Sequence, residues 1–250
     1  MKSYIGIDSK AKDVKAAYIG VDGEAKKIFK GYIGVDGLAK PFYFDLDAAF
    51  QRVQYLTAAT AGPYITLPIT TQEGLKLSFE VGWVGSGASS YMGCSLSNNR
   101  AQEFRLRKKD GALIRAEGQV YIPRTNSNDY VAGTISGSAL VSVQVDFGNY
   151  PSSTATTLTV GSDSSSSTRV AMASTGNSMG LFAAFNTSTP TPHVGCFGEI
   201  KAYDASDNLI MDFVPVVKRT GSVPGFYDLV SMQFYTNEGT GSFTAGPDVT

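Results

Sequence analysis

Histidine and cysteine are nearly absent from this chain, which has one histidine and two cysteines in 250 residues. A Ser-His-Asp or Cys-His catalytic site would have to use His193, which follows a proline at the start of an expected strand, where a structural or surface role explains it better. Cys94 and Cys196 lie far apart and form no CxxC motif. They predict no metal site, and a disulfide between them stays open.

The acidic residues do not form the patterns expected of a glycosidase or of a calcium loop. An E-x-D-x-E strand is missing, and Glu80 is the lone carboxylate of its expected strand. The chain has no D-x-[DN]-x-[DN]-G motif, and surface turns account for Asp129, Asp163 and Asp207. We therefore predict a protein that is not an enzyme and that holds no metal and no cofactor.

The chain also lacks a strong charge and a long apolar run. Residues 1–43 contain eight basic and five acidic residues, and the remainder contains thirteen basic and seventeen acidic residues. Neither balance indicates nucleic-acid binding. No run approaches the roughly twenty apolar residues of a membrane span. Because Met1 to Ser3 are followed directly by the sequence YIGID from Tyr4, with no secretory h-region, we expect cytoplasmic synthesis and no membrane insertion.

What the chain does have is one motif that occurs three times at a spacing of fourteen residues. The copies read YIGID from Tyr4, YIGVDG from Tyr18 and YIGVDG from Tyr32. Alternation of residue types followed by an Asp-Gly pair predicts a β-hairpin with a two-residue turn in the second and third copies. The first copy has Asp8 and Ser9 instead, which is a weaker turn signal.

Isolated hairpins this short are only marginally stable in water, and the repeat segment contains no cysteine or histidine that could stabilise it through a disulfide or a metal ion. Two interpretations remain: a small meander packed on the following domain, or an assembly module that associates with its own copies or with a larger particle. The regularity of the copies favours assembly. The residues assigned to assembly contacts are Tyr4, Ile5, Tyr18, Ile19, Val21, Tyr32, Ile33 and Val35.

Strands and turns dominate after the repeats. Apolar residues alternate with polar ones through residues 75–83, which predicts a strand with one buried and one wet face. Residues 151–168 are rich in serine and threonine, and we interpret them as long loops around a short strand at 158–160. The sequence predicts an all-β chain: hairpin repeats in 1–43, a short connector with helical character in 44–54, and an antiparallel jelly-roll sandwich in 55–250.

The repeats resemble the N-terminal YIGVDG-x-AK repeats of tail-associated proteins of phages and prophages of Gram-positive bacteria. Three further runs are similar to a phage-borne lectin domain of the concanavalin or laminin-G type: GCSLSNNRAQEFRLR from Gly93, KAYDASDNLIMDFVPV from Lys201 and FYDLVSMQFYTNEGTGSFTAGPDV from Phe226. The resemblance covers most of the chain, and residues 119–190 contribute least to it. It implies a virion protein of the tail, made in the host cytoplasm, that forms a homotrimer, contacts other virion proteins and recognises the host surface.

Two groups of residues are candidates for that recognition. Asn126, Asn128, Asp129 and Tyr130 combine amide, carboxylate and aromatic side chains, as sugar sites do, although a polar turn explains them equally well. Arg100, Arg105 and Arg107 belong to a basic cluster that could contact an anionic polymer such as teichoic acid, although a solvated sheet face is the simpler explanation. The alternatives to host recognition are a purely structural virion component without a ligand and, less favoured, a wall-degrading enzyme.

Overall fold

The regular secondary structure of the protein, seen in a computed structural model, is almost entirely β-strand. The structure describes residues 4–7, 10–13, 17–21, 24–28, 30–35, 38–44, 46–70, 72–82, 89–95, 103–109, 115–121, 131–134, 140–149, 152, 155–168, 178–186 and 189–249. The helical segments in these ranges are a single turn, α1 (Leu46–Ala49), and the short η2 (Thr220–Ser222). No helix in the described ranges is long and apolar enough to cross a membrane.

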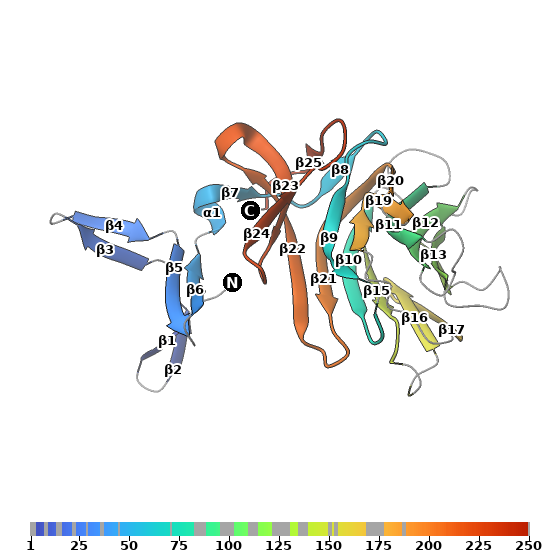
Figure 1. Ribbon diagram of the computed structural model, residues 1–250, viewed down its shortest axis with the longest axis horizontal. Helices are drawn as coiled ribbons and strands as arrows, with labels where there is room; N and C mark the ends of the chain where they lie inside the picture. The colour runs from blue at the N-terminus through green and yellow to red at the C-terminus, as the bar shows by residue number, and fades with distance from the viewer. Residues whose placement is uncertain are drawn as a thin grey trace.

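The three sequence repeats form three hairpins. The strands are β1 (Tyr4–Ile7), β2 (Lys10–Asp13), β3 (Ala17–Val21), β4 (Glu24–Ile28), β5 (Lys30–Val35) and β6 (Leu38–Phe44). The last pairs of the three hairpins are Ile7 with Lys10, Val21 with Glu24 and Val35 with Leu38. Two residues therefore separate the paired strands of each hairpin, which is the spacing that the sequence predicts for the second and third copies. Each hairpin is a two-stranded sheet of its own, to one side of the remaining strands (Figure 1).

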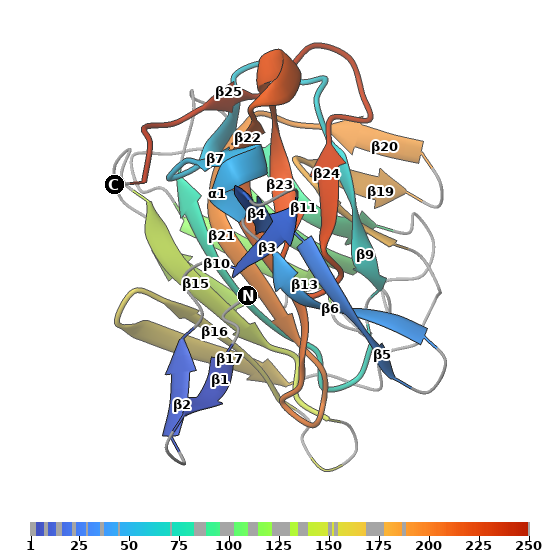
Figure 2. The same cartoon turned by 90° about the vertical axis from the view of Figure 1, so that its left-hand side faces the viewer.

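A large antiparallel sheet forms the first layer of the sandwich. In order across the sheet its strands are β17 (Asp163–Thr168), β16 (Ala155–Val160), β15 (Val141–Asp146), β10 (Lys76–Gly82), β21 (Gly195–Tyr203), β22 (Leu209–Lys218), β23 (Val223–Asp228) and β24 (Gln233–Thr236). Three short strands extend it: β7 (Phe50–Arg52) pairs with β22, β8 (Leu56–Ala58) with β21, and β25 (Thr244–Ala245) with β8. Figure 2 shows this order from the side of the hairpins.

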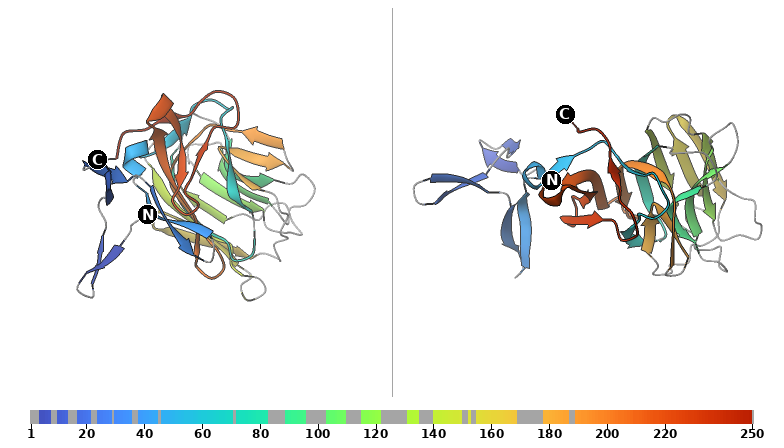
Figure 3. Two further views of the ribbon diagram at one scale, coloured as in Figure 1. Left: turned by 60° about the vertical axis from the view of Figure 1, so that its left-hand side comes forward. Right: turned by 90° about the horizontal axis from the view of Figure 1, so that it is seen from above.

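The second layer lies on the far side from the hairpins (Figure 3). Its strands are β14 (Val131–Thr134), β13 (Arg115–Tyr121), β12 (Glu103–Lys109), β11 (Ser89–Ser95), β19 (Ala183–Asn186) and β20 (Thr189–Pro192), with a separate pair of β9 (Ile65–Thr70) and β18 (Ser178–Leu181). Among the described residues of this layer the strand pairs are antiparallel, except for the parallel pair of β11 and β19. The all-β prediction, hairpin repeats followed by an antiparallel sandwich, is confirmed.

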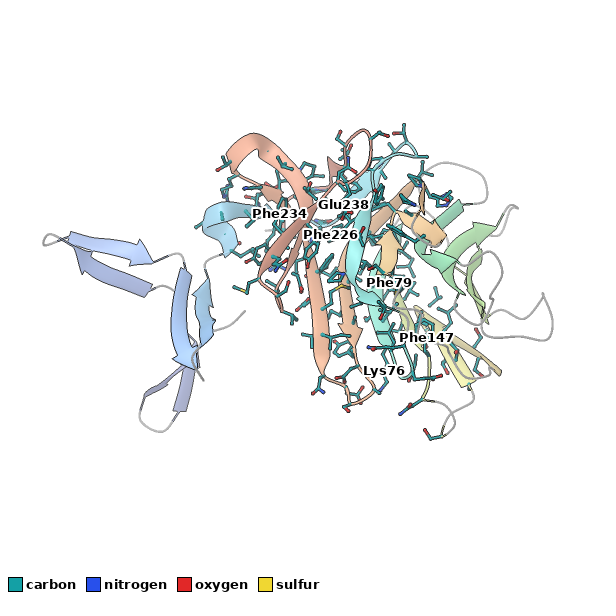
Figure 4. The ribbon with its side chains drawn as sticks, viewed as in Figure 1. Lys76, Phe79, Phe147, Phe226, Phe234 and Glu238 are labelled. Atoms are coloured by element: carbon teal, nitrogen blue, oxygen red, sulfur yellow. The ribbon has the colours of Figure 1, made fainter. Side chains whose placement is uncertain are left out.

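The main core fills the space on the inner face of the large sheet. Along β10, Leu77, Phe79 and Val81 are buried, while Lys76 and Ser78 are half-buried and Glu80 is exposed, as the alternation predicts. The rings of Phe79 and Phe197 lie 6.2 Å apart, and Figure 4 shows Phe79 and Phe147 inside the sandwich. Period-two burial on a twisted sheet thus separates an apolar inner face from a polar outer face.

A second, smaller core covers part of the outer face and attaches the connector. Phe50 of β7 packs with Val214, Val216, Tyr227 and Met232. Leu46 of α1 and Phe234 pack against this cluster. The segment 44–54 contains the helical turn α1, and it also contributes β7, which pairs with β22 of the large sheet.

Two details differ from the sequence interpretation or complete it. Residues 163–168, interpreted as loop, form the edge strand β17, which pairs along its whole length with β16. Main-chain pairing with a formed neighbour outweighs the weak strand preference of serine. Cys196, whose redox state the sequence left open, is a free thiol whose pKa is raised by burial.

Candidate functional site

The outer face of the large sheet carries a groove with a volume of about 360 Å³. It spans β10, β15, β16 and β21 and reaches the turn between β21 and β22, at the end of the sheet where Figure 4 labels Lys76. Its lining residues are Lys76, Leu77, Ser78, Gln144, Val145, Asp146, Thr157, Thr159, Tyr203 and Asp207. Except for Leu77 and Val145, whose side chains are buried in the core, all of them have a polar group in the side chain.

Strand register brings these polar residues together from distant parts of the chain. Lys76 pairs with Asp146 on one side and with Tyr203 on the other. The next outward position of each strand continues the pattern, since Ser78 pairs with Gln144. β16 extends both rows, with Thr157 opposite Asp146 and Thr159 opposite Gln144. The floor of the groove therefore consists of two parallel rows of side chains, each crossing several strands.

The turn between β21 and β22 forms one wall of the groove. Asp204 holds this turn, because its Oδ1 atom accepts hydrogen bonds from the backbone N–H groups of Ser206 (2.8 Å) and Asn208 (2.9 Å). Asp207 adopts a positive φ of 62°, and its carboxylate forms an ion pair with Lys76. Gly74 also has a positive φ, and a methyl group there would overlap the Cβ atom of Ala205, so only glycine allows the neighbouring loop to approach the turn this closely.

Several polar groups of the groove have no protein partner. In the described part of the chain, the side chains of Ser78, Gln144 and Thr157 form no hydrogen bond or ion pair. Asp146 uses its Oδ1 atom to accept the N–H of Gly148 at 2.7 Å, which leaves the other carboxylate oxygen open to the groove. Such a surface offers donors, acceptors and the half-buried aromatic ring of Tyr203 to a ligand.

A network of ion pairs lies next to the groove on the same face. Lys201, opposite Ser78 in register, lies 3.2 Å from Glu199 Oε2 and 3.3 Å from Asp212 Oδ1. Burial opposes the charge of Lys201, but Asp212 and Glu199 outweigh that effect and raise its pKa. Arg52 of β7 completes the network with a 3.0 Å contact to Glu199 Oε1. The network links the groove to the small core under the connector.

The candidate sugar residues from the sequence, Asn126, Asn128, Asp129 and Tyr130, lie outside the described residues, as does Arg100. Arg105 and Arg107 occupy alternate positions of β12 in the second sheet, opposite Gln119 and Glu117 of β13, whereas the described lining of the groove comes from the large sheet.

Sequence reasoning missed the groove itself. Its only local signal is the polar half of alternating strands, for example Lys76 and Ser78 between buried Leu75, Leu77 and Phe79. His193 is not among its lining residues. No cluster of three or more potential metal ligands occurs in the described ranges.

Comparison with solved structures gives a match for the fold. The chain is similar to a crystal structure of a "putative carbohydrate binding protein" from Bacteroides ovatus ATCC 8483, with a TM-score of 0.51 and 11% sequence identity. The match covers 91% of this chain and 68% of the other. At this identity the likeness shows a shared β-sandwich fold alone. Scans against family models and against curated proteins give no match.

Proposed function

We propose that this protein binds a surface glycan in the groove of the large sheet and does not cleave it. The observation that carries the proposal is one concave site that holds the unpartnered hydroxyl and amide groups of Ser78, Thr157 and Gln144. The second carboxylate oxygen of Asp146 lies in the same site and accepts no hydrogen bond from the protein. Sugar hydroxyls require both donors and acceptors, and hydroxyl and amide side chains supply both. The carbohydrate-binding description of the Bacteroides ovatus protein, which shares the sandwich fold, supports the same class of ligand.

The polar rows suit an extended ligand that lies across the strands. Adjacent strands are about 4.8 Å apart, so the four strands that contribute to the groove present about 14 Å of polar floor. Tyr203 stands at one end of a row, where its ring can stack on the apolar face of a sugar, and Thr157 stands at the other end. The ligand we propose is therefore a segment of a polysaccharide rather than a single sugar.

We propose further that the hairpins attach the sandwich to a phage tail or a similar multi-chain particle. Two features support this part: the resemblance of the repeats to those of phage tail-associated proteins, and the pairing of each described hairpin with itself only, which leaves its two strand edges without a ladder partner. The sandwich would then present the groove to the host surface. A component of the particle without any ligand is the competing function.

A binding experiment separates these functions. The full chain should bind one or more polysaccharides of a glycan array, and should adhere to whole host cells that display them. Gln144→Ala together with Tyr203→Ala should reduce the affinity about tenfold or more, because each removes a contact worth about 1 kcal/mol.

Ser142→Ala is a matched control, since Ser142 is an exposed residue of β15 that lies two positions before Gln144 and is not among the lining residues of the groove. Equal binding by the groove variant and this control would contradict the groove as the site. Failure to bind any glycan or cell, with normal assembly of the particle, would favour the purely structural role. Release of new reducing ends from a bound polysaccharide would contradict the non-enzymatic part.

A further inference from the structure

The cations on the groove face are already engaged by carboxylates. Lys76, the cation among the lining residues, is paired with Asp207, and the hydrogen bond to Asp207 and the nearby charge of Asp146 raise its pKa. Lys201, next to the groove, is shared between Glu199 and Asp212. A ligand anion would have to compete with an existing carboxylate for either ammonium group.

Carboxylates are also in excess among the charged residues that line the groove. The charged residues of the described lining are Asp146, Asp207 and Lys76, which together give a formal charge of −1. One carboxylate oxygen of Asp146, a lining residue of the groove, accepts no hydrogen bond from the protein. A sugar hydroxyl can donate a hydrogen bond to that oxygen, whereas a phosphate or uronate group placed there would be repelled.

From this arrangement we infer that the groove selects uncharged glycans and rejects anionic ones such as phosphate-bearing or uronate-bearing polymers. The inference rests on the proposed glycan-binding function and names the class of ligand within it. Specificity arises here from a repulsive element as much as from attraction, because the hydroxyl and amide groups alone would accept either class. Recognition of an anionic polymer would instead require the arginine-bearing strand β12, which belongs to the other sheet.

The charge of the groove can be changed with little change in its shape. Asp207→Asn keeps a residue type that tolerates positive φ, and Asp146→Asn keeps an oxygen to accept the N–H of Gly148. The double variant turns the formal charge of the lining from −1 to +1 and leaves the ammonium group of Lys76 without a carboxylate partner in the groove. Glu80→Gln removes the same type of charge from an exposed position of β10 outside the groove and is the matched control.

The test uses the full chain and an array of paired oligosaccharides, each present in an uncharged form and in a carboxylated or phosphorylated form of the same backbone. The wild type and Glu80→Gln should bind the uncharged member at least about tenfold more tightly, and the double variant should bind both members within about threefold. The preference of the wild type should weaken in high salt, since screening reduces the repulsion of the anionic member.

Each other result has a distinct meaning. Tighter binding of the anionic members by the wild type would overturn the inference and leave glycan recognition standing. An unchanged preference in the double variant would also overturn it, because the selectivity would then come from another part of the protein. Absence of binding to every member of the array would contradict the proposed function itself, and the inference with it.

Discussion

At the scale of single residues, Asp204 shows how a carboxylate outside the described lining can support the wall of the groove. Its two oxygens accept hydrogen bonds from the side chain of Asn208 (2.9 Å) and from the backbone of Ser206 and Asn208. These bonds, that of the Asn208 side chain first, lower the pKa of Asp204 below its ordinary value of 3.8. The charged form of Asp204 is therefore the one that stabilises the turn.

This shift predicts an acid-dependent contribution to stability. A folded-state pKa below the unfolded value means that the contribution is present above pH 3.8 and is lost as the pH falls through the lower, folded-state pKa. Wild type should have a higher urea midpoint than Asp204→Ala at about pH 7, and the gap should shrink by about pH 2.5. Asp204→Asn, which keeps an oxygen acceptor but does not titrate there, is the control. A gap of constant size at both pH values would contradict the assignment.

Single residues also show why the groove escaped the sequence analysis. The burial of Leu77, Phe79 and Val81 could be predicted, because alternation is a local property. The meeting of Lys76 with Asp146 and Tyr203 could not, because it depends on the register of strands separated by more than sixty residues in the chain. Polar outward positions look alike in sequence wherever they lie.

At the scale of elements, β7 and α1 fix the point at which the hairpin segment leaves the sandwich. Phe50 is 6% exposed, and its ring centroid lies 5.0 Å from that of Tyr227 and 5.1 Å from that of Phe234. Arg219 reinforces the joint by donating to the backbone oxygen of Asp47 and to Gln51 Oε1, both at 3.0 Å. The connector is thus packed on the outer face of the large sheet.

Truncation of Phe50 should loosen this joint. Phe50→Ala should reduce the free energy of unfolding by about 3 kcal/mol, since it removes a buried aromatic ring and leaves a cavity. Proteolysis between residues 44 and 54 should become faster than in the wild type, while glycan affinity stays the same because the groove lies elsewhere on the sheet. Phe50→Leu is the matched control and should show smaller effects. Unchanged unfolding in urea and unchanged cleavage would show that the cluster does not hold the connector.

Elements differed in how well the sequence predicted them. The second and third hairpins could be predicted because Asp-Gly pairs favour positive φ locally, and the registers of these hairpins leave two residues between the paired strands. Strand β17 could not be predicted from its serines, because its pairing partner β16 decides its conformation. The same limit applies to β7, a three-residue strand defined by its pairing with β22.

At the scale of the whole molecule, the connector and the groove occupy the same face of the large sheet. Val214 and Val216, in the core under the connector, continue the outward row of β22 that contains Asp212, and Asp212 faces Lys201 beside the groove. Figure 2 shows the hairpins in front of this face. A partner chain that binds the hairpins would therefore meet the sandwich on the side of its groove. If the hairpins attach the sandwich to a particle, as proposed, their position determines how much of the groove stays open to the proposed polysaccharide.

The attachment role makes a prediction about association in solution. The full chain should form an oligomer, which we expect to be a trimer, because hairpins that pair only with themselves leave strand edges with which a second copy can pair. Replacing Ile5, Ile19 and Ile33 together with Ser should give a monomer in sedimentation equilibrium, with the glycan affinity per groove unchanged. Adhesion to cells should nevertheless fall by about a hundredfold or more, since several grooves on one particle act with high effective concentration.

The control is the triple variant Lys12→Ser, Lys26→Ser and Lys40→Ser, made in the partner strands of the same hairpins, which tests for a general effect of altering the segment. A wild-type chain that remains monomeric at micromolar concentration would show that the repeats do not associate with their own copies, and attachment would then require a different virion protein.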